Sequence, residues 1–253
     1  MAKNGKRVAW VTGGGSGIGE AGAEALAADG WTVVVSGRRK DALETVVAKI
    51  AKAGGTAEAL ALDVSNANDA QKAADHIVAK HGRIDLLVNN AGINVPKRNW
   101  KDMELDGWDR LVQVNLNGVL YCMRAVLPTM RKQQDGSIIN VSSWAGRHVS
   151  KMPGPAYTTT KHAVLALTHS FNMDECVNGL RACCLMPGEV ATPILKSRPV
   201  PPSEAEQAKM LQPEDCGRTI AFVAGLPPRV CVNEILISPT HNRGFIQTPA
   251  SND

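Results

Sequence analysis

Tyr157 and Lys161 lie four residues apart near the start of a segment with helical spacing, so both side chains lie on one face of the predicted helix. A free tyrosine has a pKa of about 10, and proton transfer near neutral pH requires about 4 kcal/mol of phenolate stabilisation. A neighbouring ammonium group and a positively charged ring can supply this. The pair predicts an acid/base centre at Tyr157, although this spacing also occurs by chance on ordinary helix faces.

A glycine-rich turn near the start of the sequence follows a short apolar run and precedes a helical segment. Glycines allow a sharp turn and close approach of the backbone to a pyrophosphate, whose charge then meets the helix N-terminus. The strand–turn–helix context favours this role over a purely structural turn. The predicted phosphate-binding residues are Gly13, Gly15, Ser16, Gly17, Ile18 and Gly19.

Short β-branched runs alternate with longer helical segments along the chain, which predicts an α/β fold. The expected strands are Arg7–Thr12, Thr32–Ser36, Ala59–Val64, Leu86–Asn89, Ser137–Ser142, Arg181–Leu185 and Glu234–Ile237. The expected helices are Ile18–Asp29, Asp41–Ala53, Asn68–His81, Trp108–Met130 and Ala156–Cys176.

This alternation predicts a Rossmann-like, doubly wound parallel sheet of about seven strands, with helices on both faces in three αβα layers. Residues 1–253 are expected to form a single dinucleotide-binding domain. The proline-rich stretch at about 192–213 is expected to be an irregular flap over the substrate, or else an ordinary surface excursion. Ligands of such sheets bind beyond the carboxyl ends of the strands, where the motifs fall.

Three motifs together resemble the short-chain dehydrogenase/reductase superfamily. The spacing of Thr12 to Gly19 is the family's T-G-x-x-x-G-x-G turn, Asn89-Asn90-Ala91-Gly92 follows the fourth expected strand, and Asp63-Val64 ends the third. The resemblance covers about residues 5–193 and implies hydride transfer between NAD(P)(H) and an alcohol or carbonyl carbon. Its last turn, Ser238-Pro239-Thr240, departs from the family's glycine-rich pattern.

The resemblance also implies a catalytic set around Tyr157 and Lys161, with Lys161 reaching the ribose hydroxyls. Ser143 matches the serine that polarises the substrate oxygen, with Ser142 as the alternative. Asn115 matches the residue that holds a water between Lys161 and solvent, and Asn117 is the less favoured candidate for this role. The alternative is that Asn115 has only a structural role, as a hydrogen-bonded asparagine of the core.

Further cofactor contacts are carried over from the family to the turns that follow the strands. In the family, the residues at the positions of Asp63 and Val64 flank the adenine, and the Asn90-Ala91-Gly92 turn lines the cofactor site. The turn after the sixth strand contacts the nicotinamide carboxamide. These residues are Asp63, Val64, Asn90, Ala91, Gly92, Pro187, Gly188, Val190 and Thr192, together with Tyr157 and Lys161 themselves.

The second strand ends in Ser36-Gly37-Arg38-Arg39-Lys40, without the carboxylate that NAD enzymes place beside the ribose hydroxyls. Cations before a helix oppose its dipole unless an anion binds there. We therefore predict NADP(H), with Arg38 and Arg39 binding the 2′-phosphate as bidentate donors. An NAD(H)-preferring alcohol dehydrogenase is the alternative, and a non-catalytic dinucleotide sensor is a remote one because such sensors lack the Tyr or the Lys.

The substrate pocket is expected to include Asn94, Trp144, His148 and Glu189, a mixture that defines no substrate class. Glu189 would favour a hydroxylated or cationic substrate if its carboxylate faced the nicotinamide; a solvent-facing turn residue is at least as good an interpretation. His148 is equally well explained as a surface residue.

Composition excludes several other functions. A net charge of +4 is too diffuse for nucleic-acid binding, and the apolar run at 8–12 is too short for a signal peptide or membrane span. Six cysteines without C-x-x-C spacing predict buried free thiols and no metal site. We expect a cytoplasmic enzyme acting on a small molecule, assembled as a homotetramer or dimer through the long helices.

Overall fold

The fold was analysed in a computed structural model, which describes residues 6–243 and 245. A sheet of seven parallel strands forms its centre, in the order β3-β2-β1-β4-β5-β6-β7. The chain therefore winds outward from β1 in one direction and from β4 in the other. This is the doubly wound, Rossmann-like arrangement that the alternation of strands and helices predicts.

The strands of the sheet are β1 Val8–Thr12, β2 Thr32–Gly37, β3 Thr56–Ala61, β4 Leu86–Asn89, β5 Gly136–Val141, β6 Leu180–Pro187 and β7 Glu234–Ile237. The α-helices are α1 Gly17–Ala28, α2 Lys40–Lys52, α3 Ala67–His81, α4 Leu105–Val112, α5 Gly118–Gln133, α6 Pro155–Glu175, α7 Glu204–Gln207 and α8 Pro213–Gly225.

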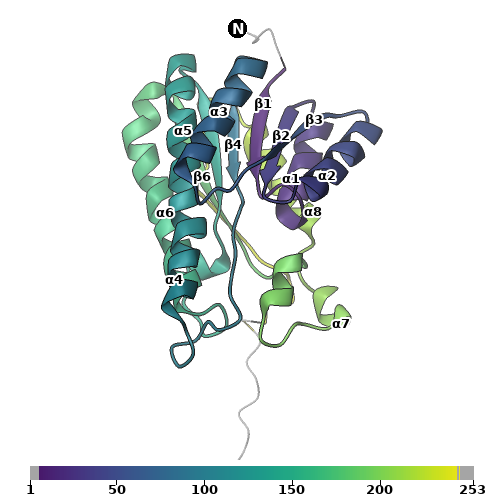
Figure 1. The fold of residues 1–253 in the computed structure, drawn as a ribbon, viewed down its shortest axis with the longest axis vertical. Coiled ribbons are helices and arrows are strands. Elements are labelled where there is room, and N and C mark those ends of the chain that lie inside the picture. The colour runs from purple at the N-terminus through teal and green to yellow at the C-terminus, as the bar shows by residue number, and fades with distance from the viewer. Residues whose placement is uncertain (1–5, 244, 246–253) are drawn as a thin grey trace, which may run out of the picture.

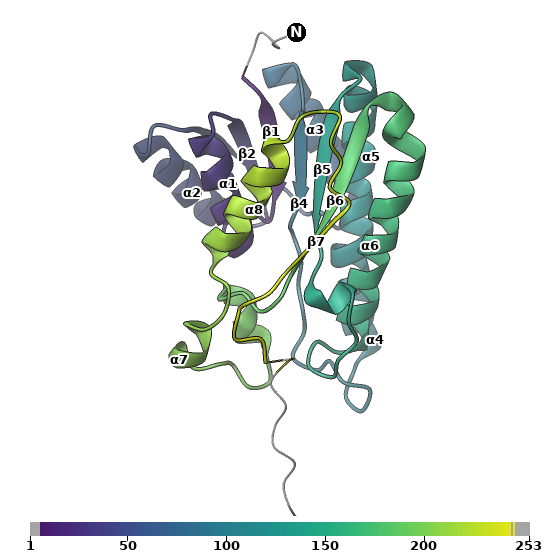
Figure 2. The same cartoon turned by 180° about the vertical axis from the view of Figure 1, so that it is seen from behind.

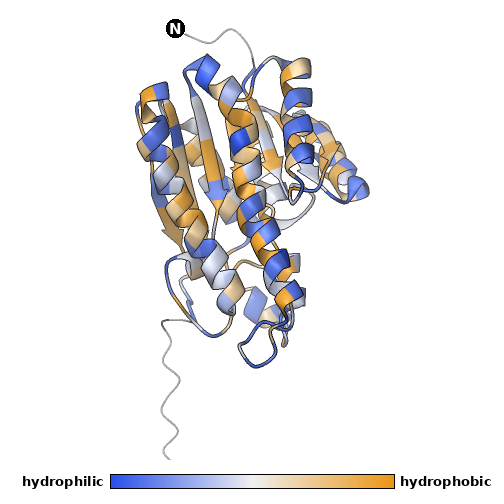
Figure 3. Ribbon diagram, turned by 60° about the vertical axis from the view of Figure 1, so that its left-hand side comes forward, coloured by the Kyte–Doolittle hydropathy of each residue, from blue (hydrophilic) through white to orange (hydrophobic). Residues whose placement is uncertain are grey.

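Two apolar clusters bury the two faces of the sheet. Alternate residues of β1 contribute to opposite clusters: Val8 and Trp10 to one, Ala9 and Val11 to the other, as the period of two in a strand requires. Helices α3, α5 and α6 cover the first face, and α1, α2 and α8 cover the second (Figures 1 and 2). Figure 3 shows the apolar residues concentrated on the strands and on the helix surfaces that meet them.

The neighbouring strands β1 and β4 are the point where the strand order reverses. The helices that follow these two strands lie on opposite faces, so their loops separate and leave a crevice at the carboxyl edge of the sheet. Both the glycine-rich turn after β1 and the Asn-Ala-Gly turn after β4 lie at this crevice. No helix within the described residues is long and apolar enough to cross a membrane.

The structure corrects two predicted elements. The third strand ends at Ala61 rather than Val64, so Asp63 and Val64 lie in the connection that follows it. The predicted helix 108–130 is not one regular helix: α4 and α5 are separated by a π-helical turn, Gln113–Asn117. Such a turn inserts an extra residue and is frequent at functional sites.

The segment at 192–213 is more ordered than predicted, with a short 3-10 helix at Pro193–Ser197 and the helix α7. A backbone bridge between Val190 and Leu211 joins both ends of this segment. It lies beyond the carboxyl edge of the sheet, at the bottom of Figure 1. Helix α8, which packs against α1, was not predicted.

Candidate active site

Thr12 connects the two turns of the crevice. Its buried hydroxyl accepts hydrogen bonds from the backbone N–H groups of Asn90 (3.0 Å) and Ala91 (3.1 Å) and donates to the carbonyl of Val88 at 3.3 Å. The side-chain amide of Asn90 donates in return to the carbonyls of Thr12 (3.1 Å) and Gly13 (3.2 Å). The two predicted cofactor motifs are therefore one hydrogen-bonded unit.

The glycines of the first turn are required by close packing and by backbone conformation. A Cβ on Gly19 would lie 2.3 Å from the carbonyl oxygen of Gly13, and Gly13 itself has a φ of +64°. At Gly17, with a φ of +59°, a Cβ would lie 3.0 Å from the methyl group of Thr192. The turn thus exposes bare backbone at the start of α1, where Ser16 makes no side-chain cap bond. The first N–H groups of a helix have no partner within the helix, so those of α1 can bind an anion.

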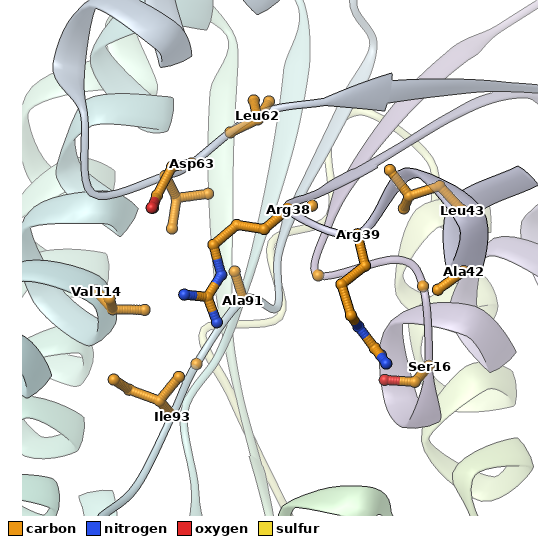
Figure 4. A pocket seen from close by; sticks show the side chains of 15 residues that line it. Ser16, Arg38, Arg39, Ala42, Leu43, Leu62, Asp63, Ala91, Ile93 and Val114 are labelled. Atoms are coloured by element: carbon orange, nitrogen blue, oxygen red, sulfur yellow. The ribbon is translucent and has the colours of Figure 1, made fainter.

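A pocket extends from this turn to the ends of β2, β3 and β4 (Figure 4). Arg38 and Arg39 both line it, with Arg38 reaching across toward Ile93 and Val114 and Arg39 pointing toward Ser16. Neither arginine forms an ion pair with a carboxylate of the described residues. Two guanidinium groups at the edge of a phosphate-binding turn provide donors for a further phosphate.

Asp63 lines the same pocket. Burial raises the pKa of its carboxyl group, but hydrogen bonds from the Ser65 N–H (3.0 Å) and hydroxyl (2.8 Å), with the nearby charge of Arg38, lower it overall. Both bonds go to one oxygen, Oδ1, so the other remains for a ligand. The glycine turn, the free helix N-terminus and this acceptor fit a dinucleotide with its adenosine half in the pocket.

Tyr157 lies in the first turn of α6, and the hydroxyl of Ser143, which accepts from the N–H of Ala145 at 3.2 Å, lies near enough to its phenol to lower the pKa of that group. Burial raises the pKa of the Tyr157 phenol, while the Ser143 hydroxyl and the charges of Arg198 and Arg98 act in the opposite direction. The neighbouring Ser142 points elsewhere, because its hydroxyl donates to the carbonyl of Lys161 at 2.8 Å. Of the two candidate serines, the structure brings Ser143 to the phenol.

Lys161 lies one turn further along α6 and is 4% exposed. Its Nζ is 5.6 Å from the centre of the Tyr157 ring and donates to the carbonyl of Val141 at 2.9 Å. Burial lowers the pKa of Lys161 to about 8, because a charged ammonium loses hydration there. The ammonium group is thus close to the phenol and already fixed by the end of β5.

Asn115 lies in the π-helical turn and is fully buried. Its side chain bonds the backbone of Ile93 in both directions, at 2.8 and 3.0 Å. A Cβ on Gly92 would lie 3.4 Å from the Nζ of Lys161 and 3.5 Å from the Oδ1 of Asn115. Lys161 and Asn115 therefore meet at the turn after β4. The alternative, Asn117, bonds Gln113 instead.

The turn after β6 contains the other carried-over residues. The N–H of Gly188, which follows Pro187, donates to the carbonyl of Ile237 at 2.7 Å. Val190 is buried and pairs with Leu211, while Thr192 packs against Gly17 as described above. The end of β6 therefore meets the glycine-rich turn across the crevice.

The four predicted substrate residues lie in the loops that follow β4, β5 and β6. The amide of Asn94 is occupied by the carbonyl of Pro153 (3.0 Å) and the N–H of Val95 (2.8 Å). Trp144 stacks on His148 with ring centres 4.5 Å apart, and Phe245 contacts the edge of Trp144 at 5.4 Å.

Glu189 is paired with Arg198 at 2.9 Å and forms a bidentate ion pair with Arg243. Burial raises the pKa of this carboxyl group, but the two guanidinium groups lower it overall. Its charge is therefore compensated within the chain. Arg198, Arg243 and the nearby Arg98 are functional candidates that the sequence motifs did not indicate.

A glycine-rich turn at a helix N-terminus and a Ser–Tyr–Lys group at the carboxyl edge of one doubly wound sheet are typical of a nucleotide-dependent α/β enzyme. The model of the short chain dehydrogenase family matches residues 7–201. An uncharacterized oxidoreductase of Staphylococcus aureus strain N315 is 34% identical over 233 residues, which are 92% of this chain and 97% of that protein. The chain therefore belongs to the short-chain dehydrogenase family and is an oxidoreductase acting on CH–OH or C=O groups.

Solved structures agree with this assignment. A metagenomic short-chain oxidoreductase in complex with NADP is 32% identical, with a TM-score of 0.81 over 93% of this chain and 98% of that one. An alcohol dehydrogenase of the archaeon Thermococcus sibiricus, complexed with 5-hydroxy-NADP, is 28% identical, with a TM-score of 0.84 over 94% and 98%. The chain is therefore similar to proteins that bind a nicotinamide dinucleotide.

Proposed function

We propose that the chain is an NADP(H)-dependent dehydrogenase/reductase in which Tyr157 exchanges a proton with the substrate oxygen. The observation that supports this most directly is the position of the Tyr157 phenol, which has the hydroxyl of Ser143 close to it and the buried ammonium group of Lys161 5.6 Å from the centre of its ring. A substrate oxygen placed between the two hydroxyl groups receives two hydrogen bonds. The bound dinucleotide supplies or accepts the hydride.

In the direction of reduction, the protonated phenol of Tyr157 donates its proton to the substrate oxygen as the carbonyl carbon accepts the hydride. Ser143 donates a hydrogen bond to the same oxygen and stabilises its developing negative charge. Because burial raises the pKa of Tyr157, the phenol holds its proton until the substrate oxygen becomes basic. Oxidation of an alcohol reverses both transfers.

Lys161 and Asn115 return the proton to Tyr157. The ammonium group of Lys161 stabilises the phenolate left after reduction, and we propose that Asn115 and the backbone at Gly92 hold a water that joins Lys161 to solvent. The proximity of Asn115 Oδ1 and Lys161 Nζ to one point beside Gly92 supports this path.

The preference for NADP(H) rests on Arg38 and Arg39, which line the adenosine pocket without an ion-pair partner among the described residues. The two NADP-bound relatives support the same choice. The alternative is an alcohol dehydrogenase of the same fold that prefers NAD(H). Rates measured in parallel with NADPH and NADH distinguish the two cofactor preferences.

The test is a screen of aldehydes, ketones and keto esters with NADPH and NADH, followed by absorbance of the reduced nicotinamide. Tyr157→Phe should lower turnover about a hundred- to ten-thousand-fold without loss of NADPH binding, measured by nucleotide fluorescence. Tyr121→Phe is the matched control, because Tyr121 lies on α5, where its hydroxyl accepts a hydrogen bond from the side chain of Gln113. Wild-type turnover by Tyr157→Phe would refute the mechanism, and nucleotide binding without any turnover would favour a sensor.

A further inference from the structure

Arg98 is a buried cation that has no counter-ion among residues 6–243 and 245. It is 5% exposed, and its Nε donates to the carbonyl of Val95 at 2.8 Å while Nη2 donates to the carbonyl and hydroxyl of Ser197. Across the part of the chain that the structure describes, no carboxylate lies within ion-pair distance of it. Burial and the charge of Arg198 both lower the pKa of Arg98. A charge withdrawn from water in this way is unfavourable unless an anion compensates it.

The surrounding charges do not compensate Arg98. Glu189 is shared by Arg198 and Arg243, and Arg243 also contacts Glu206 at 3.3 Å. Three guanidinium groups therefore face two carboxylates, one of which is the half-exposed Glu206. The group retains at least one unit of positive charge.

The positively charged side chains of Arg98 and Arg198 lie close to Tyr157. Gly154, three residues before Tyr157, packs so closely on Arg98 that a Cβ there would lie 2.2 Å from the Arg98 carbonyl oxygen. The charges of Arg198 and Arg98 both lower the pKa of the Tyr157 phenol, which places them within electrostatic range of it. The loops after β4 and β6 thus bring Arg98 and Arg198 to the region around the first turn of α6, which contains Tyr157.

We propose that Arg98 and Arg198 bind a carboxylate of the substrate, so that the enzyme acts on a small hydroxy acid or the corresponding keto acid. This inference rests on the proposed role of Tyr157. A guanidinium group has five N–H donors. In Arg98, Nε and Nη2 donate to two backbone carbonyls and to the hydroxyl of Ser197. In Arg198, Nη1 contacts the carboxylate of Glu189. Among the described residues, the remaining donors of both side chains pair with no other carboxylate, and a carboxylate matches a guanidinium group in geometry.

The reaction leaves the carboxylate unchanged. In oxidation, the hydroxyl proton passes to Tyr157, the hydride on the same carbon passes to the oxidised nicotinamide, and a keto acid is formed. The carboxylate held by Arg98 and Arg198 fixes the position of the neighbouring carbinol carbon relative to Tyr157 and Ser143. Glu189 has a different role from direct substrate binding, because it positions Arg198 and Arg243.

A second role of the same arginines must be separated from substrate binding. Their charges stabilise the Tyr157 phenolate, so removing either one alters the rate with every substrate. The ratio of kcat/KM for a keto acid to that for its neutral methyl ester cancels this common effect. Only recognition of the carboxylate changes the ratio.

The experiment uses two matched pairs, pyruvate with methyl pyruvate and acetoacetate with methyl acetoacetate, in the direction of reduction. The wild-type enzyme should prefer the acid in at least one pair, and Arg98→Gln should lower the acid-to-ester ratio about tenfold or more, mainly through KM. Arg198→Gln should act in the same direction. It serves as the second variant because Arg98 also joins two loops, and melting temperatures are measured for both. Arg229→Gln, an exposed arginine after α8, should leave the ratio unchanged.

The outcomes separate the inference from the proposed function. Three results together would overturn carboxylate binding while leaving the role of Tyr157 intact. The enzyme would reduce the esters without preferring the acids, the acids would not inhibit competitively, and the acid-to-ester ratio would be unchanged in Arg198→Gln. Failure to reduce any carbonyl compound with either dinucleotide would overturn the proposed function itself. Loss of the acid preference in both arginine variants, with ester turnover retained, supports the inference.

Discussion

Replacing Arg38 and Arg39 together by alanine should remove the preference for NADPH. A hydrogen bond to a charged group contributes about 1.5–3 kcal/mol, but both side chains are exposed, so solvent screening reduces each contribution to about 1 kcal/mol. The double variant should therefore lose about 2 kcal/mol, or about thirtyfold in kcat/KM for NADPH. The value for NADH should change little, because it has no 2′-phosphate.

The assay is steady-state kinetics with each reduced dinucleotide at a fixed, saturating carbonyl substrate. Added salt should narrow the wild-type preference, since exposed charges are screened. Arg229→Ala is the matched control: it removes one exposed arginine from the loop before β7, at the opposite edge of the sheet. A wild-type preference below about tenfold, or one that survives the double substitution, would refute the assignment of the phosphate site.

Three further predictions concern other parts of the structure. Alcohol oxidation should accelerate as pH rises, because Tyr157, whose pKa is raised by burial, must lose its proton before it can accept one from the alcohol. Arg198→Gln removes a charge that lowers this pKa, so the rise in kcat/KM for a neutral alcohol should move to higher pH. An unchanged pH profile would contradict the electrostatic role of Arg198. Thr12→Val leaves two backbone N–H groups without their partner and should lower the melting temperature by roughly 5–15 °C, whereas Thr12→Ser should not; equal melting temperatures would disprove the link between the two turns. Although burial raises the pKa of Glu58, hydrogen bonds from two histidines and a lysine lower it to about 2, so its contribution to stability is present above pH 4.5 and is lost as pH falls toward 2. Denaturant titrations of Glu58→Gln should therefore differ from wild type at pH 5 and converge near pH 2, and a difference independent of pH would be the contrary result.

The alternation of apolar runs and helical segments was sufficient to predict the fold, because each buried strand is both apolar and short. The third strand was misplaced for a physical reason: Leu62 and Val64 are buried although they lie beyond the end of β3 at Ala61. Apolar character reports burial and does not by itself report strand pairing. Helix α8 could have been found, since Pro213 at its start and the capping pair of Gln212 and Asp215 are sequence signals.

The site was predictable only where short motifs define it. The glycine turn and the Tyr–Lys pair are local patterns, and the structure brings them together at one crevice. The π-helical turn that contains Asn115 depends on tertiary packing and has no local signature. Arg98, Arg198 and Arg243 are ordinary loop arginines in the sequence, and only the fold places them around one reacting group.

The contacts of Arg243 with Glu189 and of Phe245 with Trp144 determine how the protein should be handled. A purification tag or reporter attached on the carboxyl-terminal side of Phe245 would compete with these contacts. Fusion before β1 places the addition at the other edge of the sheet, far from the chemistry. Kinetic comparisons should therefore use protein that was purified through an amino-terminal tag and from which the tag was then cleaved.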